Sequence, residues 1–111
     1  MKQPLISIVV PAYNVENYIR KCIDSILNQT YSNWELLLIV GGQDLTPSIC
    51  DEYASKDSRI KAIHDNKGLA PARNVGFHNA VGEWITYIDG DDWVEPNMLQ
   101  YVIQKINSIQ E

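Results

Sequence analysis

Short apolar runs alternate along the chain with longer segments whose apolar residues recur every three to four positions. The runs at residues 5–10 (LISIVV) and 35–40 (ELLLIV) are apolar almost throughout and have the length of strands buried on both faces. A third run, at residues 83–88 (EWITYI), is typical of a strand, and a weaker one at residues 59–64 (RIKAIH) mostly alternates polar with apolar residues, as an edge strand does. The pattern therefore predicts four strands.

Helical periodicity fills the segments between these strands. Apolar positions and starting signals predict helices at residues 15–27, 46–54, 71–80 and from residue 96 onward. We expect Pro11 to end the first strand, Asn14 to cap the first helix and Thr46 to cap the second. Each strand is thus followed by a helix.

Strict alternation of strands and helices indicates an α/β fold. Such a chain forms a mostly parallel sheet, here of about four strands, with right-handed crossovers and helices on both faces. The chain has 111 residues, enough to bury a core without disulfides, and no linker or repeat divides it. We therefore expect a single domain over residues 1–111.

The charge balance argues against one class of partner. The chain carries 14 acidic and 9 basic residues and has no basic cluster, so nucleic acid is not an expected partner. No apolar run approaches the ~20 residues that span a bilayer, and no signal-peptide cleavage pattern follows the first run. Cys22 and Cys50 lack metal-ligand spacing, so we interpret them as buried thiols of a cytoplasmic protein.

Candidate chemistry lies at the strand ends, because ligands of parallel α/β sheets bind beyond the carboxyl ends of the strands. Asp89, Asp91 and Asp92 (DGDD) follow the last strand, where three crowded carboxylates repel one another unless water or a cation screens them. Oxygen ligands favour Mg²⁺, Mn²⁺ or Ca²⁺. The alternative is a solvated Asp-Gly turn, although the flanking Ile88 and Trp93 favour a packed site.

Arg73 is predicted in the first turn of the third helix, where the helix dipole disfavours a cation. An anionic partner is therefore expected, either a ligand phosphate or Asp91. An exposed surface arginine is the alternative. Gly41 and Gly42 would let backbone approach a phosphate, but they fit neither the dinucleotide fingerprint nor a Walker loop.

Several motifs occur in a fixed order: PAYN at residues 11–14, SILNQTY at 25–31, NKGLAPARN at 66–74 and DGDD at 89–92. Over nearly the whole chain they resemble the N-terminal half of a family 2 glycosyltransferase with the GT-A fold. The resemblance implies an inverting enzyme module that binds a nucleotide-diphospho-sugar, usually a UDP-sugar, with Mn²⁺ or Mg²⁺. The sugar would pass to a hydroxyl of a glycan or lipid-linked acceptor.

The same resemblance implies a set of site residues. The loop at residues 11–14 would line the base, Arg73 would lie near the base or the diphosphate, and Asp89 would approach the ribose. Asp91 would hold the metal and Asp92 would support it. The full nucleotide-sugar set is Pro11, Ala12, Tyr13, Asn14, Asp44, Asn66, Gly68, Arg73, Asp89 and Gly90.

One departure from the family pattern lies after the second strand. Family members have a D-D-G-S-x-D stretch there, whereas this chain has VGGQD at residues 40–44. In the family one of those aspartates hydrogen-bonds uracil, so its loss would cost ~1 to 3 kcal/mol with the base buried. Asp44 would match the final Asp of that stretch.

A non-catalytic nucleotide- or partner-binding module is the alternative function. A receiver-like domain ranks last, because such a domain needs an acidic pair after its first strand, where this chain has PAYN.

The resemblance also implies a catalytic domain about twice this length, with acceptor recognition and the catalytic base in the other half. We therefore expect this chain to bind a donor without useful transferase activity of its own. The full enzyme would be cytoplasmic or peripheral to the inner face of the membrane.

The resemblance further implies that later strands of the same sheet follow the strand at residues 83–88. Without them the edge of this strand is bare, which predicts self-association.

Overall fold

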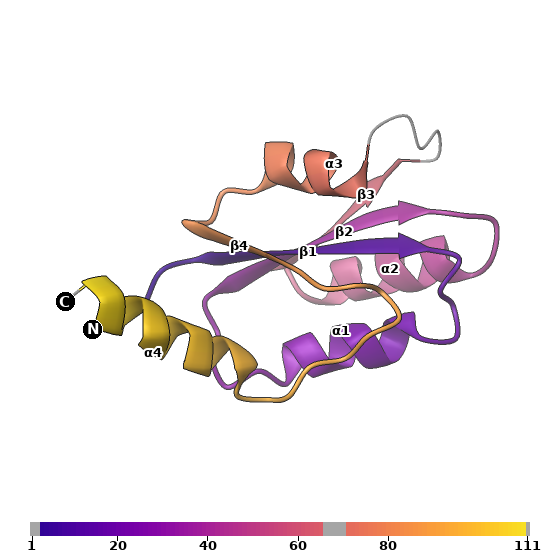
Figure 1. Ribbon diagram of the computed structural model, residues 1–111. Helices are drawn as coiled ribbons and strands as arrows, with labels where there is room; N and C mark the ends of the chain where they lie inside the picture. Colours follow the sequence, from indigo (N-terminus) through magenta and orange to yellow (C-terminus); the bar gives the residue numbers. More distant parts are fainter. Residues whose placement is uncertain (1–2, 66–70, 111) are drawn as a thin grey trace.

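The computed structural model describes residues 3–65 and 71–110. Four parallel strands form one sheet in the order β3-β2-β1-β4 (Figure 1). The predicted α/β class, the parallel sheet and the edge position of the third strand are confirmed. The elements in chain order are β1 (Ile6–Tyr13), α1 (Ile19–Leu27), β2 (Trp34–Gly41), α2 (Thr46–Lys56), β3 (Ile60–His64), α3 (Ala72–Asn79), β4 (Trp84–Tyr87) and α4 (Met98–Gln110).

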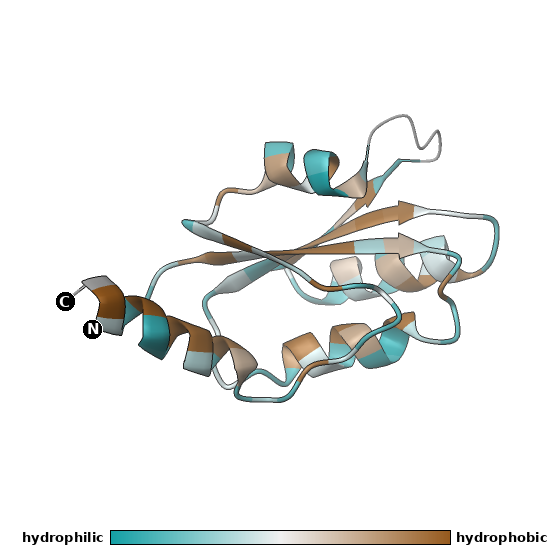
Figure 2. Ribbon diagram, in the orientation of Figure 1, coloured by the Kyte–Doolittle hydropathy of each residue, from teal (hydrophilic) through white to brown (hydrophobic). Residues whose placement is uncertain are grey.

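Helices cover both faces of the sheet, but unequally. In Figure 1, α1, α2 and α4 lie below the sheet and α3 lies above it. All eight residues of β2 are buried, and their side chains alternate between the two faces. Leu36 and Leu38 belong to the larger core against α1 and α2, whereas Leu37 and Ile39 belong to the smaller core against α3. Figure 2 shows the resulting hydrophobic colour along the central strands.

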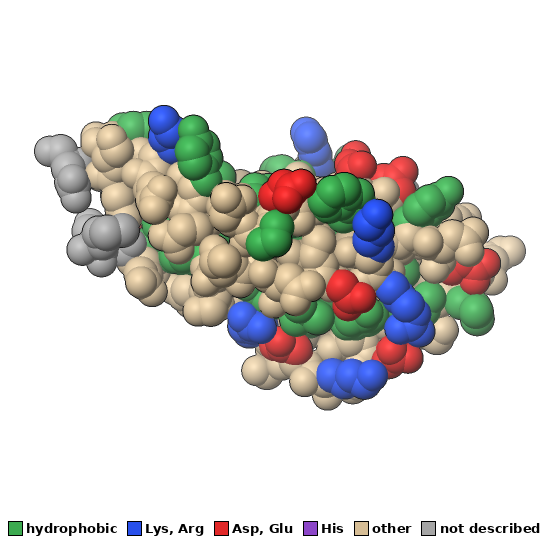
Figure 3. All heavy atoms as spheres, turned by 90° about the horizontal axis from the view of Figure 1, so that it is seen from below, with side chains coloured by type: hydrophobic (Ala, Val, Ile, Leu, Met, Phe, Trp, Pro, Cys, Tyr) green, Lys and Arg blue, Asp and Glu red, His purple; other side chains and the backbone are tan. Residues whose placement is uncertain are grey.

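The outer surface of the larger helical layer carries charged, polar and hydrophobic side chains. Seen from below in Figure 3, acidic and basic side chains are interspersed over this face rather than separated by sign. Arg20 of α1, for example, pairs with Glu52 of α2 at 2.8 Å. No helix within residues 3–65 and 71–110 is long and apolar enough to cross a membrane.

The first strand continues past Pro11 to Tyr13, so the expectation that Pro11 ends it is wrong. Pro11 pairs with Ile39 of β2, whereas β4 pairs with β1 only as far as Val9. The Val9 carbonyl accepts the Ile88 N–H (3.1 Å), and Pro11, two residues further on, faces the same side. The missing proline N–H therefore ends the ladder with β4 while leaving the ladder with β2 intact.

The first helix begins later than its apolar pattern predicts. Residues 15–18 form a turn in which the Val15 carbonyl accepts the N–H groups of Tyr18 and Ile19, both at 2.9 Å. Asn14 does not cap this helix. Its backbone is left-handed (φ 54°), and its Oδ1 accepts the Gln43 N–H at 3.1 Å, so it binds the loop after β2 instead.

Cys22 and Cys50 are buried free thiols, as predicted. Burial raises the pKa of each thiol to about 12, and nearby carboxylates add to the effect at Cys22. A protonated, inaccessible thiol is neither a nucleophile nor a metal ligand. Both side chains therefore act as small core residues.

A buried carboxylate joins β1, β2, β3 and the segment before β4 at the amino-terminal end of the sheet. The Glu35 carboxylate of β2 accepts the Ser7 hydroxyl of β1 (2.6 Å) and the Val81 N–H before β4 (2.8 Å). The Ser7 Oγ in turn accepts the Gly82 N–H at 2.8 Å, and Lys61 of β3 lies 3.7 Å from Glu35. Only 7% of the Glu35 side chain is exposed, so these contacts replace its hydration.

Replacing this carboxylate should destabilise the fold. We expect Glu35→Ala to lower the free energy of unfolding by about 2 to 3 kcal/mol, because it removes a charged acceptor and leaves the Val81 N–H unpaired. Urea denaturation measures the change. Glu52→Ala, which removes two exposed ion pairs (with Arg20 and Lys56), is the control and should have a much smaller effect. Equal losses in the two variants would contradict the role given to Glu35.

Candidate functional site

The carboxyl ends of the parallel strands lie at one edge of the sheet, and hollows lined by described residues lie there, three of which bear on the site. These have volumes of about 360, 160 and 200 Å³. The first lies between β4 and α3, the second at the ends of β1, β2 and β3, and the third beside the start of α1. The edge is where the sequence predicts ligand binding.

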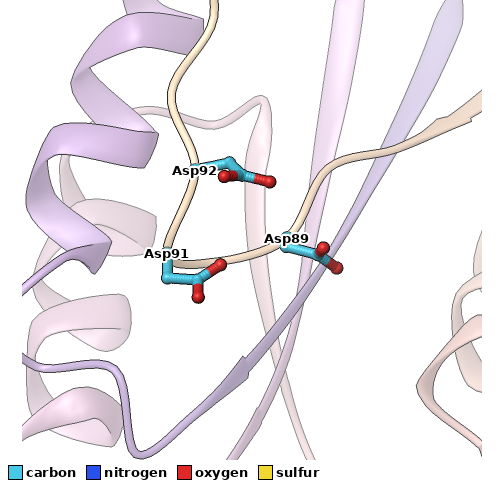
Figure 4. A group of neighbouring side chains, drawn as sticks. All are labelled: Asp89, Asp91 and Asp92. Carbon is cyan, nitrogen blue, oxygen red and sulfur yellow. The ribbon is translucent and has the colours of Figure 1, made fainter.

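The acidic motif after β4 forms a tight turn. The Asp92 N–H donates to the Asp89 carbonyl at 3.0 Å, which closes the turn. The side chains of Asp89, Asp91 and Asp92 are all exposed, and each offers a carboxylate oxygen within 4.8 Å of the other two (Figure 4). Oxygen ligands at this spacing suit a hard divalent cation such as Mg²⁺ or Mn²⁺. The three carboxylates therefore form a candidate metal centre.

Gly90 lets this turn lie against the end of β1. A Cβ at Gly90 would lie 2.7 Å from the Pro11 carbonyl oxygen and 3.2 Å from Cγ2 of Val15. The first of these contacts is with backbone, which cannot rotate away. Glycine at this position thus fixes how closely the acidic turn approaches β1.

Arg73 of α3 faces the acidic turn across the hollow between β4 and α3. Its guanidinium lies 4.9 Å from the ring centroid of Tyr87 on β4. Arg73, Asp89 and Asp92 all line the hollow, so positive and negative groups share it. No ion pair joins Arg73 to Asp91 within residues 3–65 and 71–110. The ring of Tyr87 is its partner instead, through a cation–π contact.

Asp44 holds two loops together. Its Oδ2 accepts the Glu16 N–H at 3.1 Å and its Oδ1 accepts the Thr46 N–H at 3.0 Å. Desolvation opposes ionisation of Asp44, but these hydrogen bonds lower its pKa below the usual range.

Thr46 is the first residue of α2, not its cap, because Leu45 occupies the N-cap position. The Thr46 Oγ1 instead accepts the Val15 N–H at 2.9 Å.

The hollow at the ends of β1, β2 and β3 has mainly apolar walls. Pro11, Ala12 and Tyr13 line it from β1, and Asp65 lines it directly after the end of β3. Asn14 is bound to Gln43 beside it. Two residues of the expected site, Asn66 and Gly68, lie outside the described residues.

The family model described as Glycosyl transferase family 2 matches residues 7–110. The chain belongs to glycosyl transferase family 2. It is 44% identical over 107 residues to glycosyltransferase GlyA of Streptococcus pneumoniae, covering 95% of this chain and 15% of that protein. It is also 45% identical over 109 residues to the uncharacterized glycosyltransferase EpsJ of Bacillus subtilis, covering 96% and 32%. The chain thus spans about a third or less of the length of these relatives.

Solved glycosyltransferase structures have a fold similar to that of this chain, in agreement with its family. TarS of S. aureus superposes with a TM-score of 0.82 and 27% identity over 93% of this chain and 19% of that chain. TarS 1–349 in complex with UDP-GlcNAc gives a TM-score of 0.81 and 26% identity over 93% of this chain and 31% of that chain. The GT-A fold that the motifs imply is thereby confirmed.

Sequence reasoning found the acidic turn and Arg73 but missed two contributors to this family 2 edge. Tyr87 was counted as an ordinary strand residue, although it lies under Arg73. Asp65 was not named among the expected site residues, although it lines the hollow beside Tyr13. Its position directly after a strand was the signal that pointed to it.

The close packing of Gly90 predicts a measurable cost for a single methyl group. We expect Gly90→Ala to lower the free energy of unfolding by about 1 to 3 kcal/mol, because the added Cβ must displace the acidic turn from the Pro11 carbonyl. Thermal and urea denaturation measure it. Ser48→Ala, at an exposed position of α2, is the control; a Gly90→Ala protein as stable as that control would show that the turn is not packed as described.

Proposed function

We propose that this chain is the donor-binding part of an inverting glycosyltransferase, which takes a sugar from a UDP-sugar and passes it to an acceptor hydroxyl on a glycan or a lipid-linked molecule. The observation that carries the proposal is the convergence of Arg73, the acidic turn and the hollow beside Tyr13 at one sheet edge. Family membership and the likeness to TarS bound to UDP-GlcNAc support it. The buried free thiols are compatible with a cytoplasmic enzyme.

Each part of the edge suits one part of such a donor. The apolar hollow lined by Pro11, Ala12 and Tyr13 suits the base, and the Asp89 carboxylate can accept hydrogen bonds from ribose hydroxyls. Arg73 supplies a permanent positive charge near the diphosphate. Asn14 and Asp44 act by holding the surrounding loops, since their side-chain oxygens are bonded to backbone N–H groups.

Asp91 and Asp92 are the residues that would hold Mn²⁺ or Mg²⁺, with Asp89 close enough to join them. Such a cation neutralises the negative charge that grows on a departing diphosphate. The remaining task of this chain is to hold the anomeric carbon in line with the attacking hydroxyl. An inverting transfer also needs a base beside the acceptor, and we assign that base to none of the residues described. We therefore propose that the chain alone binds donor without efficient transfer.

Calorimetric titration of the chain with UDP, with and without Mn²⁺, tests the donor site. We expect binding that depends on Mn²⁺ and weakens at least tenfold in Asp91→Asn, because the amide removes a negative ligand. Glu95→Gln, an exposed carboxylate four residues away and outside the acidic cluster, is the matched control and should bind as the wild type does.

Two results would contradict the donor-site proposal. Equal binding of UDP with and without Mn²⁺ would show that the metal has no part in donor binding. No binding at millimolar UDP would favour a module that kept the fold and lost nucleotide recognition. Rapid acceptor-dependent sugar transfer by the purified chain would contradict the claim that this part lacks efficient catalysis.

The free edge of β4 supports self-association as a second property. Within residues 3–65 and 71–110, β4 pairs only with β1, and Trp84 and Tyr87 are 40% and 39% exposed. An unpaired edge with apolar side chains favours pairing with another chain. We expect the sedimentation coefficient to rise with concentration for the wild type and to stay constant for Trp84→Lys. Phe77→Lys, on α3, should associate as the wild type does; a strictly monomeric wild type would refute the idea.

A further inference from the structure

The segment that carries the acidic turn runs alongside α1 on its way from β4 to α4 (Figure 1). Two side chains of α1 bind its backbone. The Cys22 thiol donates to the Asp89 carbonyl, with sulfur and oxygen 3.6 Å apart, and the Ser25 Oγ accepts the Val94 N–H at 3.2 Å. The two anchored positions lie on either side of the carboxylates that are proposed to hold the metal, so the turn is fixed at both of its ends.

Gln29, two residues past the end of α1, extends this attachment. Its Nε2 donates to the Glu95 carbonyl at 2.6 Å and to the Ser25 carbonyl at 3.2 Å. Its Oε1 accepts the Leu99 N–H at 3.0 Å. Only 8% of Gln29 is exposed, so its amide is buried with both the nitrogen and the oxygen bonded to backbone groups. Gln29 therefore connects the end of α1 to the chain that follows the acidic turn.

The same contacts involve a motif that has no part in the donor site described so far. Gln29 belongs to SILNQTY at residues 25–31, and no residue of this motif lines the three hollows. The neighbouring Thr30 N–H donates to the Pro96 carbonyl at 2.8 Å. The Leu99 N–H that Gln29 accepts lies in the first turn of α4, where an N–H has no partner within its own helix. The motif thus fastens the whole stretch between the acidic turn and α4.

This attachment bears on metal binding because the three carboxylates of the turn repel one another. A loosely held segment would let them move apart. With the backbone fixed on both sides, their oxygens stay within 4.8 Å of one another before any cation arrives. The cost of ordering the turn is then met during folding instead of during binding, and a preorganised set of ligands binds more tightly. Loosening the segment should therefore weaken the cation site without removing a ligand.

We propose that Gln29 and Ser25 are positioning residues for the metal centre, which act by holding the backbone that follows the acidic turn against α1. Neither residue touches the donor or the metal; each acts through the backbone of Val94, Glu95 or Leu99. This inference rests on the proposed donor-binding function, in which Asp91 and Asp92 hold the cation.

The test measures the Mn²⁺ concentration that gives half-maximal binding of UDP, by calorimetric titration of the full chain. Gln29→Met keeps a side chain of similar length but makes none of the three hydrogen bonds. We expect it to raise this Mn²⁺ concentration about tenfold, while UDP affinity at saturating Mn²⁺ stays close to that of the wild type. Glu35→Ala, which removes a buried hydrogen-bonded carboxylate at the opposite end of the sheet, is the matched control and should leave the Mn²⁺ dependence unchanged.

Ser25 offers a milder pair of variants. Ser25→Ala removes the acceptor of the Val94 N–H and should raise the half-saturating Mn²⁺ concentration about threefold, whereas Ser25→Thr keeps a hydroxyl and should restore the wild-type value. Amide hydrogen exchange in the absence of metal gives an independent readout. We expect exchange at residues 89–99 to be faster in Gln29→Met and Ser25→Ala than in the wild type and in Glu35→Ala.

The outcomes separate this inference from the donor-site proposal. Unchanged Mn²⁺ dependence or unchanged amide exchange in folded Gln29→Met would overturn the positioning role and leave the donor site intact. An equal shift in Glu35→Ala would overturn it too, because general loss of stability would then be the cause. If Gln29→Met does not fold, the Ser25 pair decides: Ser25→Ala and Ser25→Thr with the same Mn²⁺ dependence would refute the proposal. A wild type that binds no UDP at any Mn²⁺ concentration would overturn the donor site and this inference with it.

Discussion

The full-length pairing of β1 with β2 is the constraint from which the site follows. All eight residues of each strand are in register, from Ile6↔Trp34 to Tyr13↔Gly41. Because the two strands end together, Tyr13 and Gly41 lie side by side at the carboxyl edge. Burial of β2 on both faces fixes this register, since a slip of one residue would exchange the side chains of the two cores.

The two ends of the sheet use carboxylates in opposite ways. At the amino-terminal end Glu35 is buried, and hydroxyl and N–H donors compensate for its lost hydration. At the carboxyl end Asp89, Asp91 and Asp92 stay exposed and close together, a repulsive arrangement that a cation would relieve. Asp44 lies between these extremes, since backbone N–H groups occupy both of its oxygens and so join two loops. The partners of a carboxylate, more than its residue type, thus decide whether it stabilises the fold or is available to a ligand.

The local sequence pattern was sufficient to predict which strands and helices form. It was not sufficient to predict the residues at which they begin and end. Apolar runs of strand length and helical periods are set by burial against neighbours, so they report the elements faithfully. Pro11 and Asn14 were misinterpreted because their local preferences are real but tertiary partners override them. The missing N–H of Pro11 falls where β4 stops, and the side chain of Asn14 is used by a loop 29 positions away in the sequence.

The sequence by itself determined the α/β class, the parallel sheet, the acidic motif and the family, because each is encoded in periodicity or in residues close along the chain. Only the tertiary structure decided that Arg73 lies over Tyr87, that Asp44 joins two loops, and that Asp65 shares a hollow with Tyr13. These contacts join residues far apart in sequence. They depend on strand order and register, which are fixed by side-chain packing across the whole sheet and leave no local signal.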